Sequence, residues 1–237
     1  MWVITHYVGR VERVALLVIA KEPLPGRAKT RLTPPCSAHQ AAQLAQAALL
    51  DTLDAVERTP ADRKVLVFEG DTRRWRRAGF EVIRQRGLGL AERLAAAFED
   101  VGEPALLVGM DTPQLTPELL LDGVHALRSP DTDAVLGPSL DGGYWSVGLG
   151  GPVEGAFAGV PMSSHSTWIR QRGRLRTLGL RIHEQPLLRD VDTIEDAWAV
   201  AGESPDSRFA AELASIRPRG RTQAAFTTTL TPAPLTG

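Results

Sequence analysis

The sequence is poor in cysteine and in long apolar runs. Its one cysteine, Cys36, excludes an internal disulfide and fits a reducing compartment. No stretch approaches the ~20 apolar residues that are needed to span a bilayer. The apolar run 14–20 is too short for a signal peptide, and Lys-Glu-Pro follows it rather than a small-residue cleavage site. We therefore expect a cytoplasmic protein with no membrane partner.

Strong net charge is also missing. The 27 Lys and Arg residues nearly balance the 28 Asp and Glu residues, which gives a net charge of −1. Such a chain has no overall field to attract nucleic acid, so any anion-binding cations must act locally. A hydrophobic content of 43% and a charged content of 23% are typical of a globular protein. The composition leaves the oligomeric state open.

Short apolar runs alternate with amphipathic segments along the chain. The expected strands are 14–20, 65–68, 80–84, 105–108, 134–136, 144–149 and 180–185. The expected helices are 37–58, 72–78, 90–101, 116–127 and 167–178, with one or more after residue 193. This alternation predicts an α/β fold with a mostly parallel central sheet flanked by helices. Strand 144–149 is expected to be antiparallel, because few residues connect it to the strand before it.

Composition divides the chain into three parts. Residues 1–12 form a polar leader, and residues 217–237 are rich in Thr and Pro with few large apolar side chains. We expect the second of these segments to be a disordered tail. Residues 13–216 are then expected to form a single domain.

Lysine is rare, and its placement points to a site. Only three of the basic residues are lysines, and two of them, Lys21 and Lys29, lie in the loop that follows the first expected strand. Arg27 and Arg31 are in the same loop. Ligands of parallel sheets bind beyond the carboxyl ends of the strands, so these cations are a candidate phosphate site. The loop is not a Walker A motif, because Ala28 stands where that motif has glycine. The alternative is an ordinary solvated surface loop.

Two acidic motifs are candidate metal sites. Asp111 directly follows an expected strand, and a carboxylate at that place can hold Mg²⁺ or Mn²⁺ together with substrate phosphates. Two acids, Asp190 and Asp192, in the stretch Arg-Asp-Val-Asp-Thr could supply a second ligand. The alternatives are an Asx-turn at Asp111 and helix capping at Asp192.

Two further motifs are candidate substrate contacts. Asp141, Gly142, Gly143 and Tyr144 combine an acid with glycines that allow close backbone approach to a ligand. A hairpin turn would have the same sequence. His165 lies in a polar loop and could contact the substrate, although a lone histidine there more often has no such role.

The motifs in chain order resemble a known group. KEPLPGRAKTRL, GMDTPQL, GPSLDGGYWSVGL, VPMSS and RDVDTIEDA resemble the bacterial glycosyltransferase-like family associated with arsenosugar biosynthesis. Its members have the GT-A fold of nucleotide-diphospho-sugar transferases. More distantly, the chain is similar to 2-phospholactate guanylyltransferase and to molybdenum cofactor nucleotidyltransferases. The resemblance covers roughly residues 14 to 201.

The resemblance implies roles for the candidate residues. The residues implied in nucleotide binding are Lys21, Arg27, Lys29, Arg31 and Gly109. Asp111 would be the metal ligand in place of the Asp-x-Asp of GT-A enzymes, although Pro113 replaces the second acid, and Asp192 would complete the metal site. Asp141 would face the sugar or acceptor and is the best guess for a catalytic base. The residues implied in substrate binding are Gly142, Gly143, Tyr144 and His165. VPMSS departs from the VPWST-like form of the family, so the resemblance does not carry over the family's choice of acceptor.

Three functions follow from these observations. The leading hypothesis is a metal-assisted glycosyltransferase that moves a sugar from a nucleotide-diphosphate donor to a small-molecule acceptor. The second is a nucleotidylyltransferase that joins an NTP to a phosphorylated small molecule and releases pyrophosphate. The third, prompted by the missing second acid, is a non-catalytic nucleotide-binding protein.

Overall fold

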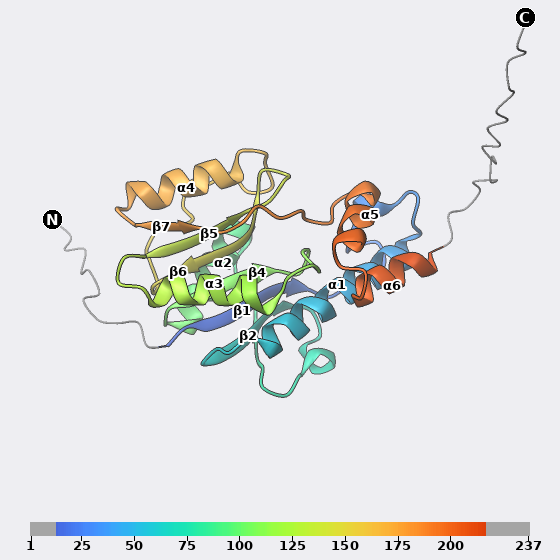
Figure 1. Ribbon diagram of the computed structural model, residues 1–237, viewed down its shortest axis with the longest axis horizontal. Helices are drawn as coiled ribbons and strands as arrows, with labels where there is room; N and C mark the ends of the chain where they lie inside the picture. The colour runs from blue at the N-terminus through green and yellow to red at the C-terminus, as the bar shows by residue number, and fades with distance from the viewer. Residues whose placement is uncertain (1–12, 217–237) are drawn as a thin grey trace, which may run out of the picture.

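The computed structural model describes residues 13–216, which form a seven-stranded sheet between helices (Figure 1). The strands are β1 (Ala15–Lys21), β2 (Arg63–Glu69), β3 (Glu81–Arg84), β4 (Ala105–Gly109), β5 (Ala134–Pro138), β6 (Tyr144–Leu149) and β7 (Ile182–Glu184). Their order in the sheet is β3-β2-β1-β4-β6-β5-β7. The predicted α/β architecture is confirmed.

The sheet is parallel except at β6, which runs antiparallel to both β4 and β5. This confirms the orientation predicted from the short connection between β5 and β6. In the centre, Lys21 at the end of β1 is in register with Glu69 of β2, and Ile19 is in register with Gly109 of β4. The carboxyl ends of β1, β2 and β4 therefore meet at one edge, where ligands of such sheets bind.

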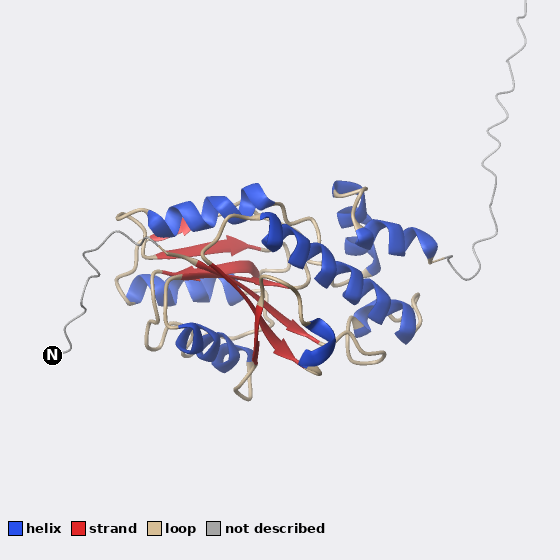
Figure 2. Cartoon of the chain, turned by 90° about the horizontal axis from the view of Figure 1, so that it is seen from below, coloured by secondary structure: helices blue, strands red, loops and turns tan. Residues whose placement is uncertain are grey.

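Helices cover both faces of the sheet (Figure 2). They are α1 (Ala38–Arg58), α2 (Leu90–Val101), α3 (Pro117–Arg128), α4 (Thr167–Thr177), α5 (Ile194–Glu203) and α6 (Arg208–Ser215). Ser37 and Gln40 form a capping box at the start of α1. Alternate residues of β1 point to opposite faces, so Leu16 packs in the cluster with α1 and α3, and Leu17 in the cluster with α2 and α4.

A third apolar cluster joins α1 to the last two helices. It includes Leu32, Leu44, Val200 and Phe209, all fully buried or nearly so. Figure 1 shows α5 and α6 beside α1 at one end of the molecule. Because Leu32 belongs to this cluster, the basic loop after β1 is anchored to the same part of the core.

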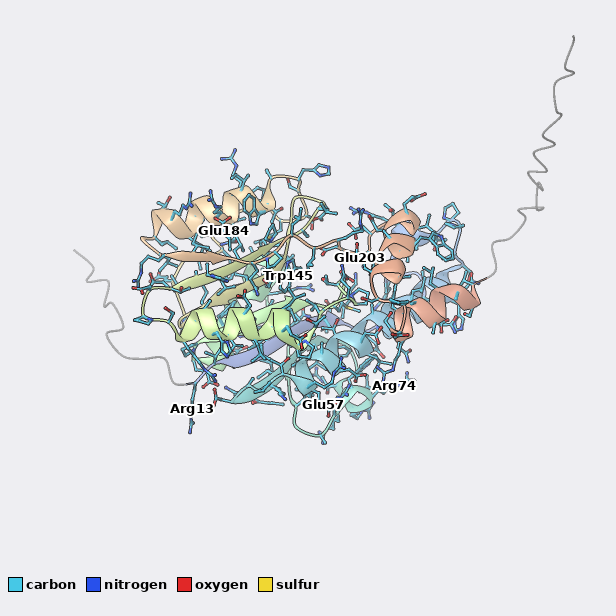
Figure 3. All side chains as sticks on the ribbon, in the orientation of Figure 1. Arg13, Glu57, Arg74, Trp145, Glu184 and Glu203 are labelled. Carbon is cyan, nitrogen blue, oxygen red and sulfur yellow. The ribbon has the colours of Figure 1, made fainter. Side chains whose placement is uncertain are left out.

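Residues 72–78 differ from the prediction of a helix. Only Thr72–Trp75 is helical, as the 3-10 turn η2, and the chain is extended again at Arg76. Tertiary contacts explain the change, because Trp75 packs on Phe68 and Arg77 pairs with Glu57 of α1. Glu57 and Arg74 lie on the same side of the molecule in Figure 3.

One predicted strand, 180–185, is shorter than expected and covers only Ile182–Glu184. The segment after residue 193 forms two helices, which agrees with the prediction of one or more. The predicted leader and tail lie outside the described residues. None of the helices in residues 13–216 is long and apolar enough to cross a membrane.

Candidate active site

The basic loop after β1 folds around a small pocket. Its cavity of about 150 Å³ is lined by Lys21, Arg27, Lys29 and Arg31, together with Asp111 and Asp192. The loop turns at Gly26, whose φ of +75° favours glycine, and continues into the 3-10 turn η1 (Thr30–Leu32). The four cations that the sequence singled out thus lie together with the two acids that it proposed as metal ligands.

Lys29 is the buried cation of this pocket. Its side chain is 7% exposed, and Nζ lies 2.6 Å from Asp111 Oδ1. The same ammonium donates a hydrogen bond to the main-chain carbonyl of Val191. Val191 N in turn donates to the carbonyl of Asp111 at 3.0 Å. Lys29 therefore ties the loop after β1 to the segment after β4 and to the segment before α5.

The other three cations are more open. Arg31 donates to Asp192 Oδ2 at 2.8 Å, in a pair whose arginine side chain is 71% exposed. Within residues 13–216, Lys21 and Arg27 form no ion pair, so their charges are available to a ligand. The loop therefore offers a bound phosphate one buried, paired cation, one exposed, paired cation and two cations without an ion pair in the described part of the chain.

A larger cavity of about 900 Å³ adjoins the small pocket. Both are lined by Lys21, Arg31, Asp111 and Asp192, so a ligand could extend from one into the other. Pockets for small molecules typically measure ≈ 300–1,000 Å³, so this space has room for a nucleotide and a second small molecule. Further lining residues, from β2 to the segment before α5, are Gly109, Glu69, Gln85, Arg93, Tyr144, Ser163, His165, Arg189 and Asp190.

The Asp-Gly-Gly-Tyr stretch is a tight turn on one wall of the larger cavity. Asp141 Oδ1 accepts hydrogen bonds from Ser139 Oγ at 2.6 Å and from Gly143 N at 2.8 Å. The main-chain oxygen of Asp141 lies 2.9 Å from His165 Nδ1. A Cβ added to Gly142, at φ +88°, would lie 2.2 Å from the carbonyl oxygen of His165. The turn and the His165 loop are thus one unit, and the carboxylate of Asp141 stabilises the turn.

Tyr144 follows this turn and also faces the larger cavity. Its hydroxyl lies 3.7 Å from Met162 Sδ, and burial raises its pKa. The phenol therefore stays protonated at neutral pH and can donate a hydrogen bond to a ligand. The next residue, Trp145, is buried in the middle of the molecule and donates to the carbonyl of Pro186 at 2.9 Å (Figure 3).

Asp190 is the first of the two acids that the sequence proposed as a second metal ligand, and the resemblance implied no role for it. Burial and the nearby charges of Asp111 and Asp141 raise its pKa to about 7. Thr112 Oγ1 lies 3.5 Å from its Oδ1. Asp190 and Asp192 are two residues apart, a spacing that puts both side chains on the same side of an extended chain, and both line the larger cavity.

The acids suit a hard divalent cation. Asp111, Asp190 and Asp192 all line the larger cavity, and carboxylate oxygens are the ligands that Mg²⁺ prefers. No group of three or more potential metal ligands converges within residues 13–216. A cation here would therefore take part of its coordination from substrate oxygens, as Mg²⁺ does at nucleotide sites.

More than half of the chain matches a known protein family. Residues 40–164 match the family described as "Uncharacterized protein conserved in bacteria (DUF2064)". The chain belongs to this family. This DUF2064 protein is also 34% identical over 210 residues to 3-phospho-D-glycerate guanylyltransferase of Phenylobacterium zucineum (strain HLK1), an alignment that covers 83% of the chain and 94% of that relative.

Solved structures agree with the predicted fold of the DUF2064 protein. A candidate nucleotide-diphospho-sugar transferase from Desulfovibrio desulfuricans G20 has a TM-score of 0.75 and 26% identity, over 85% of this chain and 94% of that one. Rv0371c from Mycobacterium tuberculosis H37Rv has a TM-score of 0.53 and 19% identity, over 81% and 99%. The DUF2064 protein therefore has the nucleotide-diphospho-sugar transferase fold. The predicted GT-A relationship is confirmed, as is the more distant similarity to guanylyltransferases.

Proposed function

We propose that the protein is a nucleotidylyltransferase, with GTP as its donor and a small phosphorylated acid as its acceptor. The observation that carries the proposal is the small basic pocket that adjoins the larger cavity. This arrangement suits a triphosphate whose terminal phosphates lie among cations while the rest of the nucleotide lies in the larger space. The similarity to 3-phospho-D-glycerate guanylyltransferase supports the choice of GTP and of a phosphorylated acid.

The reaction is a displacement at phosphorus. An oxygen of the acceptor phosphate attacks the α-phosphorus of GTP, the bond from that phosphorus to the β-phosphate oxygen breaks, and pyrophosphate leaves. Lys21, Arg27 and Arg31 hold the departing phosphates by charge-assisted hydrogen bonds. Mg²⁺ or Mn²⁺ held by Asp111 and Asp192 would neutralise charge on the leaving pyrophosphate.

The acceptor lies against the wall formed by Gly143, Tyr144 and His165, and Gly142 shapes the turn behind this wall. A phosphate nucleophile is already anionic at neutral pH and needs no general base. This agrees with Asp141, whose Oδ1 accepts two hydrogen bonds within the turn. A sugar or hydroxyl acceptor would depend more on a free base at this position.

Transfer of a sugar from a nucleotide-diphosphate donor is the second candidate. It is favoured by the structural similarity to the candidate transferase from Desulfovibrio desulfuricans. In that reaction the small pocket would hold the departing nucleoside diphosphate rather than pyrophosphate. The two reactions therefore differ in the phosphate product that is released.

The test is to identify the product. The protein is incubated with Mg²⁺, 3-phosphoglycerate and each of the four NTPs, and in parallel with nucleotide sugars and the same acceptor. We expect pyrophosphate, with GTP preferred. Release of nucleoside diphosphate from sugar nucleotides alone would favour glycosyl transfer, and tight nucleotide binding without turnover would favour the non-catalytic hypothesis.

The basic loop provides a matched comparison for the same assay. Lys21→Ala should raise KM for GTP about tenfold, because a charge-assisted hydrogen bond to phosphate is lost. Lys64→Ala is the control, since Lys64 donates at 2.6 Å to the carbonyl of Glu57 and lines neither cavity. Equal KM values for the two variants would contradict the proposed position of the phosphates.

A further inference from the structure

Lys29 differs from the other cations of the loop because its charge is buried and already has partners within the protein. The ammonium contacts Asp111 Oδ1 and the carbonyl oxygen of Val191, and only 7% of the side chain is exposed. An ammonium has three N–H donors, so two of them are used within the protein. The backbone of Lys29 has a φ of 49°, which is unusual outside glycine, so the fold holds this residue in place.

The position of the ammonium has a consequence for metal binding. Asp111 is the acid proposed to hold Mg²⁺ or Mn²⁺, and one of its two oxygens is in contact with Lys29. Two cations at the same carboxylate repel each other; Lys29 is buried, while the Asp111 side chain is 47% exposed, so solvent screens only part of the repulsion. In the free protein Lys29 therefore opposes a divalent cation at Asp111.

A nucleotide would change this balance. Lys29 also lines the small basic pocket, where the proposed function puts the terminal phosphates of the donor. A phosphate in that pocket gives the ammonium a second anionic partner. It also brings oxygens that complete the coordination of the metal.

We propose that Lys29 acts as an internal counter-cation for Asp111 and makes metal binding depend on the nucleotide. The divalent cation binds weakly to the free protein and enters together with the nucleotide. Lys29 is thus a positioning residue that controls when Asp111 becomes a metal ligand. This inference rests on the proposed function, because that function places metal and phosphates at this site.

The test is direct titration with Mn²⁺, in which free Mn²⁺ is measured by electron paramagnetic resonance with and without GTP. We expect wild type to bind Mn²⁺ weakly alone and much more tightly with GTP. Lys29→Met should bind Mn²⁺ alone about tenfold more tightly than wild type or better, because the opposing charge is removed. Lys64→Met is the matched control, since it removes the same charge from a lysine that lines neither cavity and does not touch Asp111. It should bind Mn²⁺ alone as wild type does.

Two further variants keep the test decisive. Lys29→Gln is a second neutral replacement in case Lys29→Met does not fold. The double variant Lys29→Met/Asp111→Asn should lose the gained Mn²⁺ affinity, which would locate the metal at Asp111. Mn²⁺ affinity in the neutral variants that is equal to or below that of wild type would overturn the inference.

The outcome is separable from that of the proposed function. The titration needs no turnover, so a protein that releases no pyrophosphate could still show the gain in Lys29→Met, and the counter-cation role would stand. Pyrophosphate release combined with unchanged Mn²⁺ affinity in Lys29→Met would instead leave the reaction in place and refute the role of Lys29.

Discussion

Among single residues, Asp190 has the least favourable surroundings for a charge. Its carboxyl is in a buried setting near Asp111 and Asp141, with Lys29 as the compensating cation. A buried acid among like charges costs stability in the ligand-free protein. Such residues are typical of functional sites, where stability is given up for binding or catalysis.

Replacing Asp190 should separate stability from activity. Asp190→Asn removes the like-charge repulsion, so we expect the free energy of unfolding of the ligand-free protein to rise by about 1 kcal/mol. Turnover should fall about tenfold or more, because the cation site proposed at Asp111 and Asp192 loses a neighbouring negative charge. Denaturant unfolding and steady-state kinetics measure the two effects.

Glu195→Gln is the control for this variant, since Glu195 is exposed at the start of α5. It should change neither quantity. If Asp190→Asn lowers stability and leaves turnover intact, Asp190 is a structural residue and the assignment is wrong.

The sequence predicted which residues lie together around the small pocket, but not which of them are buried or paired in the pocket. Lys21, Arg27 and Arg31 could be placed because they follow a buried strand in a parallel sheet. The burial of Lys29 could not, because its partner Val191 is 162 positions away in the chain. The sequence proposed both Asp190 and Asp192, but it did not show that Asp192 pairs with Arg31 or that Asp190 is buried near Asp111.

Among the elements, the turn before β6 is held against the start of α4 by main-chain and side-chain contacts. Trp168 N donates to the carbonyl of Gly142 at 2.8 Å, and His165 Nδ1 lies close to the carbonyl of Asp141. These contacts hold the start of α4 against the turn. The proposed acceptor wall is therefore stiff, although it consists of two loops.

Gly142→Ala tests this stiffness. The added Cβ combines a positive φ with a clash against the His165 backbone, so we expect a loss of about 3 kcal/mol in the free energy of unfolding. KM for the acceptor should rise while KM for GTP changes little. Gly79→Ala is the matched control, because Gly79 has a φ of +79° with nothing within 4 Å of an added Cβ.

The control should lose only about 1 kcal/mol, the cost of a left-handed backbone. Equal losses in Gly79→Ala and Gly142→Ala would mean that the close approach to His165 does not matter. Thermal or denaturant unfolding gives the stabilities, and initial rates give the two KM values.

Local signals predicted most elements. The capping box at Ser37 and Gln40, and Thr116 with Pro117 at the start of α3, fixed helix starts that the structure has. The prediction of a helix over residues 72–78 was wrong, because contacts with Phe68 and α1 outweigh the local preference for a helix. Strand β7 is short because only Ile182–Glu184 pairs with β5, and sequence does not show where pairing stops.

For the whole molecule, the site depends on which strands are neighbours. Strands β1 and β4 are adjacent although α1, β2, β3 and α2 separate them in the chain. This arrangement brings the loop after β1 to Asp111, and the segment before α5 closes the other side. An alternating pattern of elements predicts a mostly parallel sheet, but it does not give the strand order.

The proposed activity of the protein is the transfer of a nucleotidyl group from GTP to an acceptor phosphate. The most direct measurement uses GTP labelled with ³²P at the α-phosphate, together with Mg²⁺ and 3-phosphoglycerate, and separates the labelled products. We predict that the label moves into a new compound that joins GMP to the acceptor, with one pyrophosphate released for each molecule formed. Label that stays in GTP, or that appears only in GDP, while the protein binds GTP and Mg²⁺ would contradict the account.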